Sequence, residues 1–151
     1  MSQKIEYHKF QLVSLDIRQL SIISLADTIE EKKEVSSELD GTLRTGQSTF
    51  DKENKSIVAG IKFEINPEKE KELLVFSLTV ELRGVFKFQD EPENIDPDEI
   101  SKWLDVNCIY LLFPYLREQV YSLTQRAGFN PTILPLITVP GTPISERITQ
   151  N

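Results

Sequence analysis

Apolar and polar residues alternate most strictly between Leu74 and Phe88. Every second residue of this stretch is apolar except Gly84, and most residues between them are polar or charged. A period of two held over 15 residues predicts a long strand with one buried face, about 50 Å at about 3.3 Å per residue.

Two further stretches show the same alternation. It is clear from Ile57 to Ile65 and weaker from Leu39 to Arg44. The connections are short and polar, at 51–55 and 66–72. Short connections favour neighbouring antiparallel strands, so the three stretches predict a meander with one apolar face.

The stretch from Phe10 to Leu25 also predicts a strand, but its apolar residues change parity twice. The three groups are Phe10 and Leu12; Val13, Leu15 and Ile17; and Leu20 and Ile22. A regular strand keeps its parity, so one or two bulges are expected here. The charged stretch 26–34 that follows is expected to be an exposed connection.

A long helix is predicted from residue 97 onward. Asp96 is suited to the N-cap, Pro97 to the first helical position and Glu99 to the first turn. Gly128 is suited to the C-terminal end. Pro114 removes a backbone donor inside the helix, so a kink or a break is expected near Tyr110–Pro114.

The helix is apolar on nearly all sides from Cys108 to Leu116, without a charged residue in nine positions. Such a helix needs cover on every side, and a sheet covers only one. The second cover would be another subunit or a ligand. The residues we assign to an oligomer interface are Trp103, Cys108, Tyr110, Phe113 and Val120.

An apolar segment with regularly spaced prolines follows the helix, from Phe129 to Val139. Its three prolines favour extended backbone in the residues before them. We call this segment the strap, and we expect it to lie over apolar surface as a separable lid. An apolar surface under a lid would form a groove for apolar segments. The residues we assign to binding of such segments are Leu112, Tyr115, Leu116, Phe129, Ile133, Leu134, Leu136, Ile137 and Val139.

Length and composition are typical of one globular domain, residues 1–151, with residues 1–8 and 142–151 expected to be flexible. The fold class predicted is α+β: a four-stranded antiparallel sheet packed by the long helix and the strap. The net charge of −7 disfavours nucleic acid and anionic membranes as partners. The chain has no apolar run suited to a signal peptide or to membrane insertion, which favours the cytoplasm.

Catalytic chemistry has little support in the sequence. His8 is the only histidine and Cys108 the only cysteine, which disfavours a metal site built on histidine and cysteine and leaves no histidine in a folded region for a Ser/His/Asp set. Cys108 is expected to be a small buried hydrophobic residue. The acidic stretch 90–99 is interpreted as a solvated linker, with a seat for calcium or a basic peptide as the alternative. We therefore expect no enzymatic activity, metal or cofactor.

The helix and strap resemble the SecB family of protein-export chaperones. The residues that carry the resemblance are Leu112-Phe113-Pro114-Tyr115, Arg117-Glu118, Arg126-Ala127-Gly128-Phe129 and Leu134-Pro135-Leu136-Ile137. The resemblance implies a homotetramer built as a dimer of dimers. It also implies ATP-independent holding of unfolded client polypeptides in apolar grooves, for protein export.

The sequence departs from the export members at the positions through which they deliver clients to the SecA motor. Those members use acidic residues, whereas the matching positions here are Gln19, Ile23, Ser77 and Thr79. Delivery to SecA is therefore left open. Some SecB-like proteins instead serve the antitoxin of a toxin–antitoxin pair, and a chaperone dedicated to one such partner, or a structural interaction subunit, is the alternative.

Overall fold

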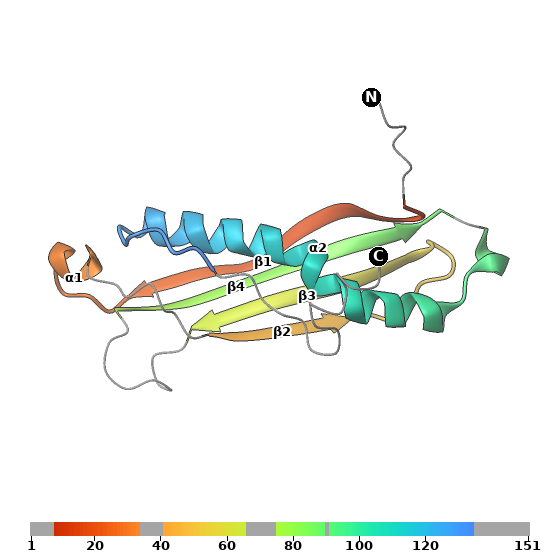
Figure 1. The fold of residues 1–151 in the computed structure, drawn as a ribbon, viewed down its shortest axis with the longest axis horizontal. Coiled ribbons are helices and arrows are strands. Elements are labelled where there is room, and N and C mark those ends of the chain that lie inside the picture. The colour runs from red at the N-terminus through yellow and green to blue at the C-terminus, as the bar shows by residue number, and fades with distance from the viewer. Residues whose placement is uncertain (1–7, 34–40, 66–74, 90, 135–151) are drawn as a thin grey trace, which may run out of the picture.

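A computed structural model describes residues 8–33, 41–65, 75–89 and 91–134 (Figure 1). Its sheet has four antiparallel strands in the spatial order β1-β4-β3-β2, and the long helix α2 lies across one face (Figure 1). The prediction of an α+β fold with this sheet and a long C-terminal helix is confirmed. The elements are β1 (Phe10–Ser24), α1 (Ile29–Lys33), β2 (Thr42–Gln47), β3 (Ser56–Ile65), β4 (Phe76–Phe88), a 3-10 turn (Pro92–Asn94) and α2 (Pro97–Arg126).

The two central strands agree with the alternation in the sequence, since buried and half-buried residues alternate along β3 and along most of β4. Strand β2 lies about three residues later than expected. Its position is set by pairing with β3, where Gly46 lies opposite Gly60. The Gln47 side chain also donates to Ser101 O (3.3 Å) and to the Asp105 carboxylate, which ties this edge of the sheet to α2.

Strand β1 contains two bulges, as its changes of parity predicted. The pairing with β4 shifts once between Leu12 and Ser14 and again between Ile17 and Gln19. Each bulge inserts one extra residue and turns the following side chains to the other face. The two shifts therefore keep the apolar residues of all three parity groups, other than the bulged Val13, on the face that α2 covers.

The connection after β1 was predicted only as an exposed segment, and it contains the short helix α1. Thr28 Oγ1 accepts a hydrogen bond from Glu31 N (3.2 Å), and the Glu31 carboxylate accepts one from Asp27 N (2.8 Å). This reciprocal capping stabilises a first helical turn. The threonine followed three residues later by glutamate was the signal in the sequence.

Helix α2 begins and ends where its capping residues predicted. The Asp96 side chain accepts from Asp98 N (3.0 Å), and Gly128 follows the C-cap with φ +84°. Pro114 lies inside the helix without breaking it, so a break is excluded. The ribbon changes direction about midway along its length (Figure 1). The loss of one backbone donor is offset here by the packing of Leu112, Phe113 and Leu116, the buried residues before and after the proline in the sequence.

The core lies between α2 and the apolar face of the sheet. One residue in every four along α2 is buried against the strands: Ile100, Leu104, Cys108, Leu112, Leu116, Val120 and Thr124. Facing them are residues of the two central strands, among them Phe76, Leu78, Val80, Leu82 and Phe86. None of the helices within the described ranges is both long enough and apolar enough to span a membrane.

Candidate functional site

The chain turns sharply after α2, and hydrogen bonds hold the turn. The Thr124 hydroxyl donates to Val120 O (2.9 Å) and accepts from Thr132 N (3.0 Å). Phe129 N donates to Thr124 O (3.1 Å), and the Phe129 ring packs against Phe76 of β4 with 4.8 Å between centroids. The beginning of the strap is therefore fixed to both the helix and the sheet.

Helix α1 fastens the same turn from the other side. Lys32 Nζ donates to Ala127 O (2.9 Å) and lies 5.0 Å from the centroid of the Phe129 ring. The Asn130 side chain donates to Lys33 O (2.6 Å). These contacts join segments almost a hundred residues apart, and we found no pattern in the sequence that would have predicted them.

The described part of the strap alternates between buried and exposed residues. Phe129, Thr132 and Leu134 are buried, whereas Ile133 is 65% exposed. We expected a separable lid, and residues 129–134 are instead held by specific contacts. Leu136, Ile137 and Val139, which we also assigned to binding, lie outside the described residues.

The other residues assigned to binding differ in burial along α2. Leu112 and Leu116 are completely buried against the sheet, and Tyr115 between them is 45% exposed. Val106 (45%) and Tyr121 (39%) are also exposed. Helix α2 therefore presents aromatic and aliphatic side chains, those of Val106, Tyr115 and Tyr121, that remain exposed in the protomer.

The residues assigned to an oligomer interface divide in the same way. Cys108 and Val120 pack against the sheet of their own protomer, and Phe113 is 7% exposed. Tyr110 and Trp103 are half-buried.

Trp103 packs against two rings from the beginning of the described chain. Its ring stacks on His8 (5.1 Å between centroids) and meets Phe10 edge-on (4.8 Å). We expected residues 1–8 to be flexible; His8 makes this contact, and residues 1–7 lie outside the described residues.

An apolar strip along β1 was missed by the sequence analysis. Val13 (50%), at the first bulge, and Leu15 (38%) and Ile17 (46%), between the two bulges, are exposed. Leu15 and Ile17 lie opposite residues of β4 that face α2, so they lie on the helix-covered side of the sheet at its edge. The parity shift that predicted the bulges also marked this strip, because it grouped the three residues together.

The acidic stretch before α2 contributes to a cavity of about 210 Å³ at the start of the helix. Its lining residues include four with aromatic rings, His8, Phe10, Phe88 and Trp103, and two acids, Asp96 and Glu99. Asp96 also caps the helix, which accounts for one of the two acids. Across the described residues, no group of three or more histidine, cysteine or acidic side chains is arranged to hold a metal ion.

Cys108 has the environment of a packing residue. Burial, with a smaller contribution from the Asp105 carboxylate, raises the pKa of its thiol from 9.0 to about 11. A thiol with a raised pKa is a poor nucleophile at neutral pH. This environment agrees with the prediction of a small buried hydrophobic residue.

The four positions at which the export members carry acids lie on strands β1 and β4. Ile23 lies directly opposite Ser77, while Gln19 lies opposite Glu81 and Thr79 opposite Ser21. These side chains alternate with residues that face α2, so they share the open face of the sheet. None of the four residues is charged, although Glu64 lies opposite Thr79 on β3 and Glu81 opposite Gln19.

The fold is shared with a solved structure. The Mycobacterium tuberculosis Rv1957 SecB-like chaperone, in complex with a ChAD peptide from the Rv1956 HigA1 antitoxin, superposes with a TM-score of 0.62. The match covers 87% of this chain and 93% of that one at 17% sequence identity.

Curated relatives match part of the sequence. The protein-export protein SecB of Nitrosomonas eutropha is 41% identical over 66 residues, covering 44% of this chain and 39% of the relative. That of Chromobacterium violaceum is 36% identical over 85 residues, covering 56% and 51%. The matches to these two relatives therefore span only about two fifths to one half of the relatives' own length.

The sequence profile of one family covers most of the chain. Residues 3–139 match the profile described as Preprotein translocase subunit SecB. The span includes the whole sheet, α2 and the strap. Together with the shared fold, this match shows that the chain belongs to the SecB family.

Proposed function

We propose that this protein is an ATP-independent chaperone of the cytoplasm that binds unfolded polypeptides and holds them unfolded for export. Membership of the SecB family supports this function. The observation that carries it is the apolar surface that the protomer leaves exposed: the β1 strip, Val106, Tyr115 and Tyr121 of α2, and Ile133 of the strap.

The mechanism follows from the chemistry of that surface. An unfolded segment would bury its own apolar side chains against these residues, gaining about 25 cal/mol per Å² removed from water. Such contacts carry little directional requirement, so clients of diverse sequence would bind. No step of holding requires a catalytic group, a metal or a cofactor, and we propose no enzymatic activity.

We also propose that the protein assembles as a homotetramer, a dimer of dimers. Two features support assembly: the half-buried residues Trp103 and Tyr110 of α2, and the edge of β1, whose outer backbone groups have no neighbouring strand within the described sheet. Tyr110→Asp is expected to reduce the mass in sedimentation, because a charge on an apolar interface is costly to bury. An unchanged sedimentation profile would exclude Tyr110 from the interface.

Aggregation assays test the holding function. The protein is mixed at stoichiometric amounts with several unrelated, slowly folding proteins, and light scattering is followed. We expect aggregation of most of them to be delayed. Failure to delay any of them would contradict general holding.

Substitutions at exposed positions locate the holding surface. Tyr115→Ser and Ile133→Ser are expected to weaken holding, since both side chains are exposed. Arg126→Ser, at an exposed charged position of the same helix, is the control. Leu134 is unsuitable for this purpose because it is buried, so a substitution there would also disturb packing.

A second candidate function is service to one dedicated partner, such as an antitoxin, or a structural interaction role. It is supported by the likeness of fold to a chaperone solved with an antitoxin peptide, and by the lack of an acid at the four matched positions, Gln19, Ile23, Ser77 and Thr79. A dedicated chaperone would bind one protein tightly and delay aggregation of unrelated proteins weakly or not at all.

The SecA motor is the partner that separates export from dedicated service. Purified SecA is titrated against the protein with and without a bound client. Binding in the micromolar range or tighter would favour delivery for export. Absence of binding in both states would favour the dedicated alternative.

A further inference from the structure

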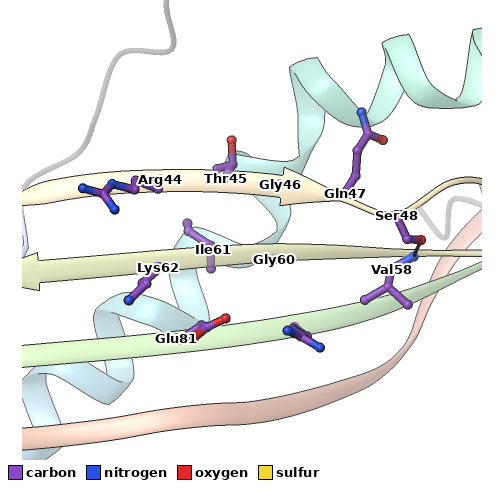
Figure 2. A pocket seen from close by; sticks show the side chains of 11 residues that line it. Arg44, Thr45, Gly46, Gln47, Ser48, Val58, Gly60, Ile61, Lys62 and Glu81 are labelled. Atoms are coloured by element: carbon purple, nitrogen blue, oxygen red, sulfur yellow. Dashed lines mark hydrogen bonds between the residues drawn. The ribbon is translucent and has the colours of Figure 1, made fainter.

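The open face of the sheet, opposite α2, carries a depression of about 490 Å³ formed across β2, β3 and β4 (Figure 2). Its centre is a pair of glycines, Gly46 and Gly60, which lie side by side on adjacent strands. Arg44, Lys62 and Glu81 lie on one side of the pair in Figure 2. The absence of two neighbouring side chains makes a notch in an otherwise continuous face.

The fold does not require glycine at either position. A Cβ atom at Gly46 would meet no heavy atom within 4 Å. At Gly60 the nearest contacts would be Leu82 O at 3.5 Å and Arg83 Cγ at 3.8 Å, which are ordinary van der Waals distances. Neither residue has the positive φ that favours glycine.

Glycine within a strand weakens the sheet when nothing in the protomer requires it. Gly60 lies in the interior of β3, and Gly46 is the penultimate residue of β2. In strands, glycine often marks a place where a ligand or another chain approaches the backbone closely. The notch is therefore better explained by an external occupant than by packing.

The charges around the notch indicate the chemistry of the occupant. Three cationic residues line it, Arg44, Lys62 and Arg83, against one acidic residue, Glu81. Arg83 lies directly opposite Gly60 on the neighbouring strand. The residues that line the notch therefore carry an excess of positive charge, whereas the chain as a whole carries a net charge of −7.

Nearby acids only partly neutralise these cations. Glu64 contacts Lys62 at 3.0 Å and Arg44 at 3.8 Å. Asp16, the residue opposite Arg83 on β1, contacts Arg18 at 3.5 Å. The Arg44 side chain is 64% exposed and Arg83 is also exposed, so both guanidinium groups are accessible for a bidentate contact with a carboxylate.

We propose that the Gly46–Gly60 notch is a docking site for an acidic segment of a partner protein, with a glutamate or aspartate side chain entering between Arg44, Lys62 and Arg83. The site faces away from the helix-covered apolar surface, so it is separate from client holding and does not depend on it. An acidic partner seated there would leave that surface accessible.

Peptide binding tests the proposal directly. The probe is a fluorescein-labelled peptide of four Glu-Gly repeats, and the reference is the same peptide with glutamine in place of glutamate. Fluorescence anisotropy is measured on the full chain at low ionic strength. We expect the acidic peptide to bind at least about fivefold more tightly than the glutamine peptide. Its affinity should fall when salt is added.

Filling the notch separates a binding role from a structural one. Gly46→Val should reduce affinity for the acidic peptide about tenfold or more, while the midpoint of urea unfolding stays the same or rises because valine favours strands. A lower midpoint would show that Gly46 serves the fold, and unchanged affinity would show that the notch is unused. Either result would overturn the proposal.

A matched pair of charge variants provides a second readout that does not alter the backbone. Arg83→Gln should lower the affinity for the acidic peptide about three- to tenfold. Lys87→Gln removes an equivalent exposed charge from the same strand and the same face, outside the notch, and should change affinity less than about twofold. Equal effects of the two variants would indicate general charge attraction and refute a specific site.

Two other occupants of the notch would each be revealed by a separate experimental outcome. If Gly46→Val lowers the mass of the assembly in sedimentation, the notch is a contact between copies of this chain. If a short single-stranded oligonucleotide binds more tightly than the acidic peptide and competes with it, the site recognises phosphate. Either result would replace the acidic protein segment as the occupant.

Discussion

The two faces of the sheet use glycine in opposite ways. On the face covered by α2, a Cβ at Gly84 would lie 2.7 Å from a methyl group of Leu12 and 3.0 Å from one of Leu112. On the open face, a Cβ at Gly46 would meet nothing within 4 Å. The first glycine is required by packing, and the second is not.

This difference shows how each face acquires its residues. The covered face is determined by close packing, since the side chains of α2 and the strands occupy one another's space. The open face has no such constraint from within the protomer. Features that weaken the sheet there, such as the glycine pair, indicate a role in contacts with other molecules.

The largest expected effect compares the two sides of α2 at adjacent positions. Leu116→Ala removes a completely buried side chain and should lower the free energy of unfolding by about 2–5 kcal/mol. Tyr115→Ala, at a residue 45% exposed, should change it by less than about 0.5 kcal/mol. Urea denaturation at fixed protein concentration measures both. Equal losses would show that the outer side of the helix is also buried in the assembly.

The next effect concerns the polar contact that holds the strap to the covered face. Thr124→Val leaves the buried amide of Thr132 without its acceptor and should cost about 1–3 kcal/mol. Hydrogen exchange at the Thr132 amide should become faster. Thr124→Ser retains the hydroxyl and is the control. Unchanged exchange in the valine variant would mean that Phe129 and Leu134 alone hold the strap.

The glycines themselves provide the direct comparison of the two faces. Gly84→Ala should destabilise the protein by about 1–3 kcal/mol, because the new methyl group overpacks the space beside Leu12 and Leu112. Gly46→Ala should stabilise it by up to about 1 kcal/mol. Thermal or urea unfolding of both variants measures the difference. A loss of stability in both variants would contradict the distinction between the two faces.

The smallest expected effect depends on pH and tests the burial of Cys108. Its pKa is raised in the folded protein from 9.0 to about 11, so above pH 9 the unfolded state loses its thiol proton before the folded state does. The unfolded state then binds fewer protons, and stability must fall as the pH rises from about 9 to 11. Below pH 9 the thiol is neutral in both states and contributes no slope.

Cys108→Ala provides the reference for this measurement. Its unfolding free energy should fall less steeply between pH 9 and pH 11 than that of the unaltered chain, although its value at pH 7 should be lower because a buried sulfur is lost. Parallel pH dependences for the two proteins would show that the thiol is accessible to water in the folded state.

Much of the fold was predictable because local patterns record it directly. Period-two alternation located β3 and β4, the changes of parity in β1 predicted its bulges, and Asp96 and Gly128 marked the ends of α2. In each case a residue's own requirement for burial, pairing or capping was visible in its immediate neighbours. The family resemblance rested on an equally local series of residues around Pro114.

The site was less predictable, since it depends on which surfaces meet. The apolar run through α2 could not show that Cys108, Leu112 and Leu116 are buried against the sheet while Tyr115 stays exposed. That division follows from how the helix rotates against the strands.

What the sequence by itself determined, then, is the set of elements and the surplus of apolar residues in β1, α2 and the strap. Only the tertiary structure decided which of them remain exposed, that α1 fastens the strap through Lys32, and that Gly46 and Gly60 adjoin on the open face. The physical reason is the range of the interactions. Propensity, capping and alternation act within a few residues, whereas burial and the glycine notch result from contacts between segments distant in the chain.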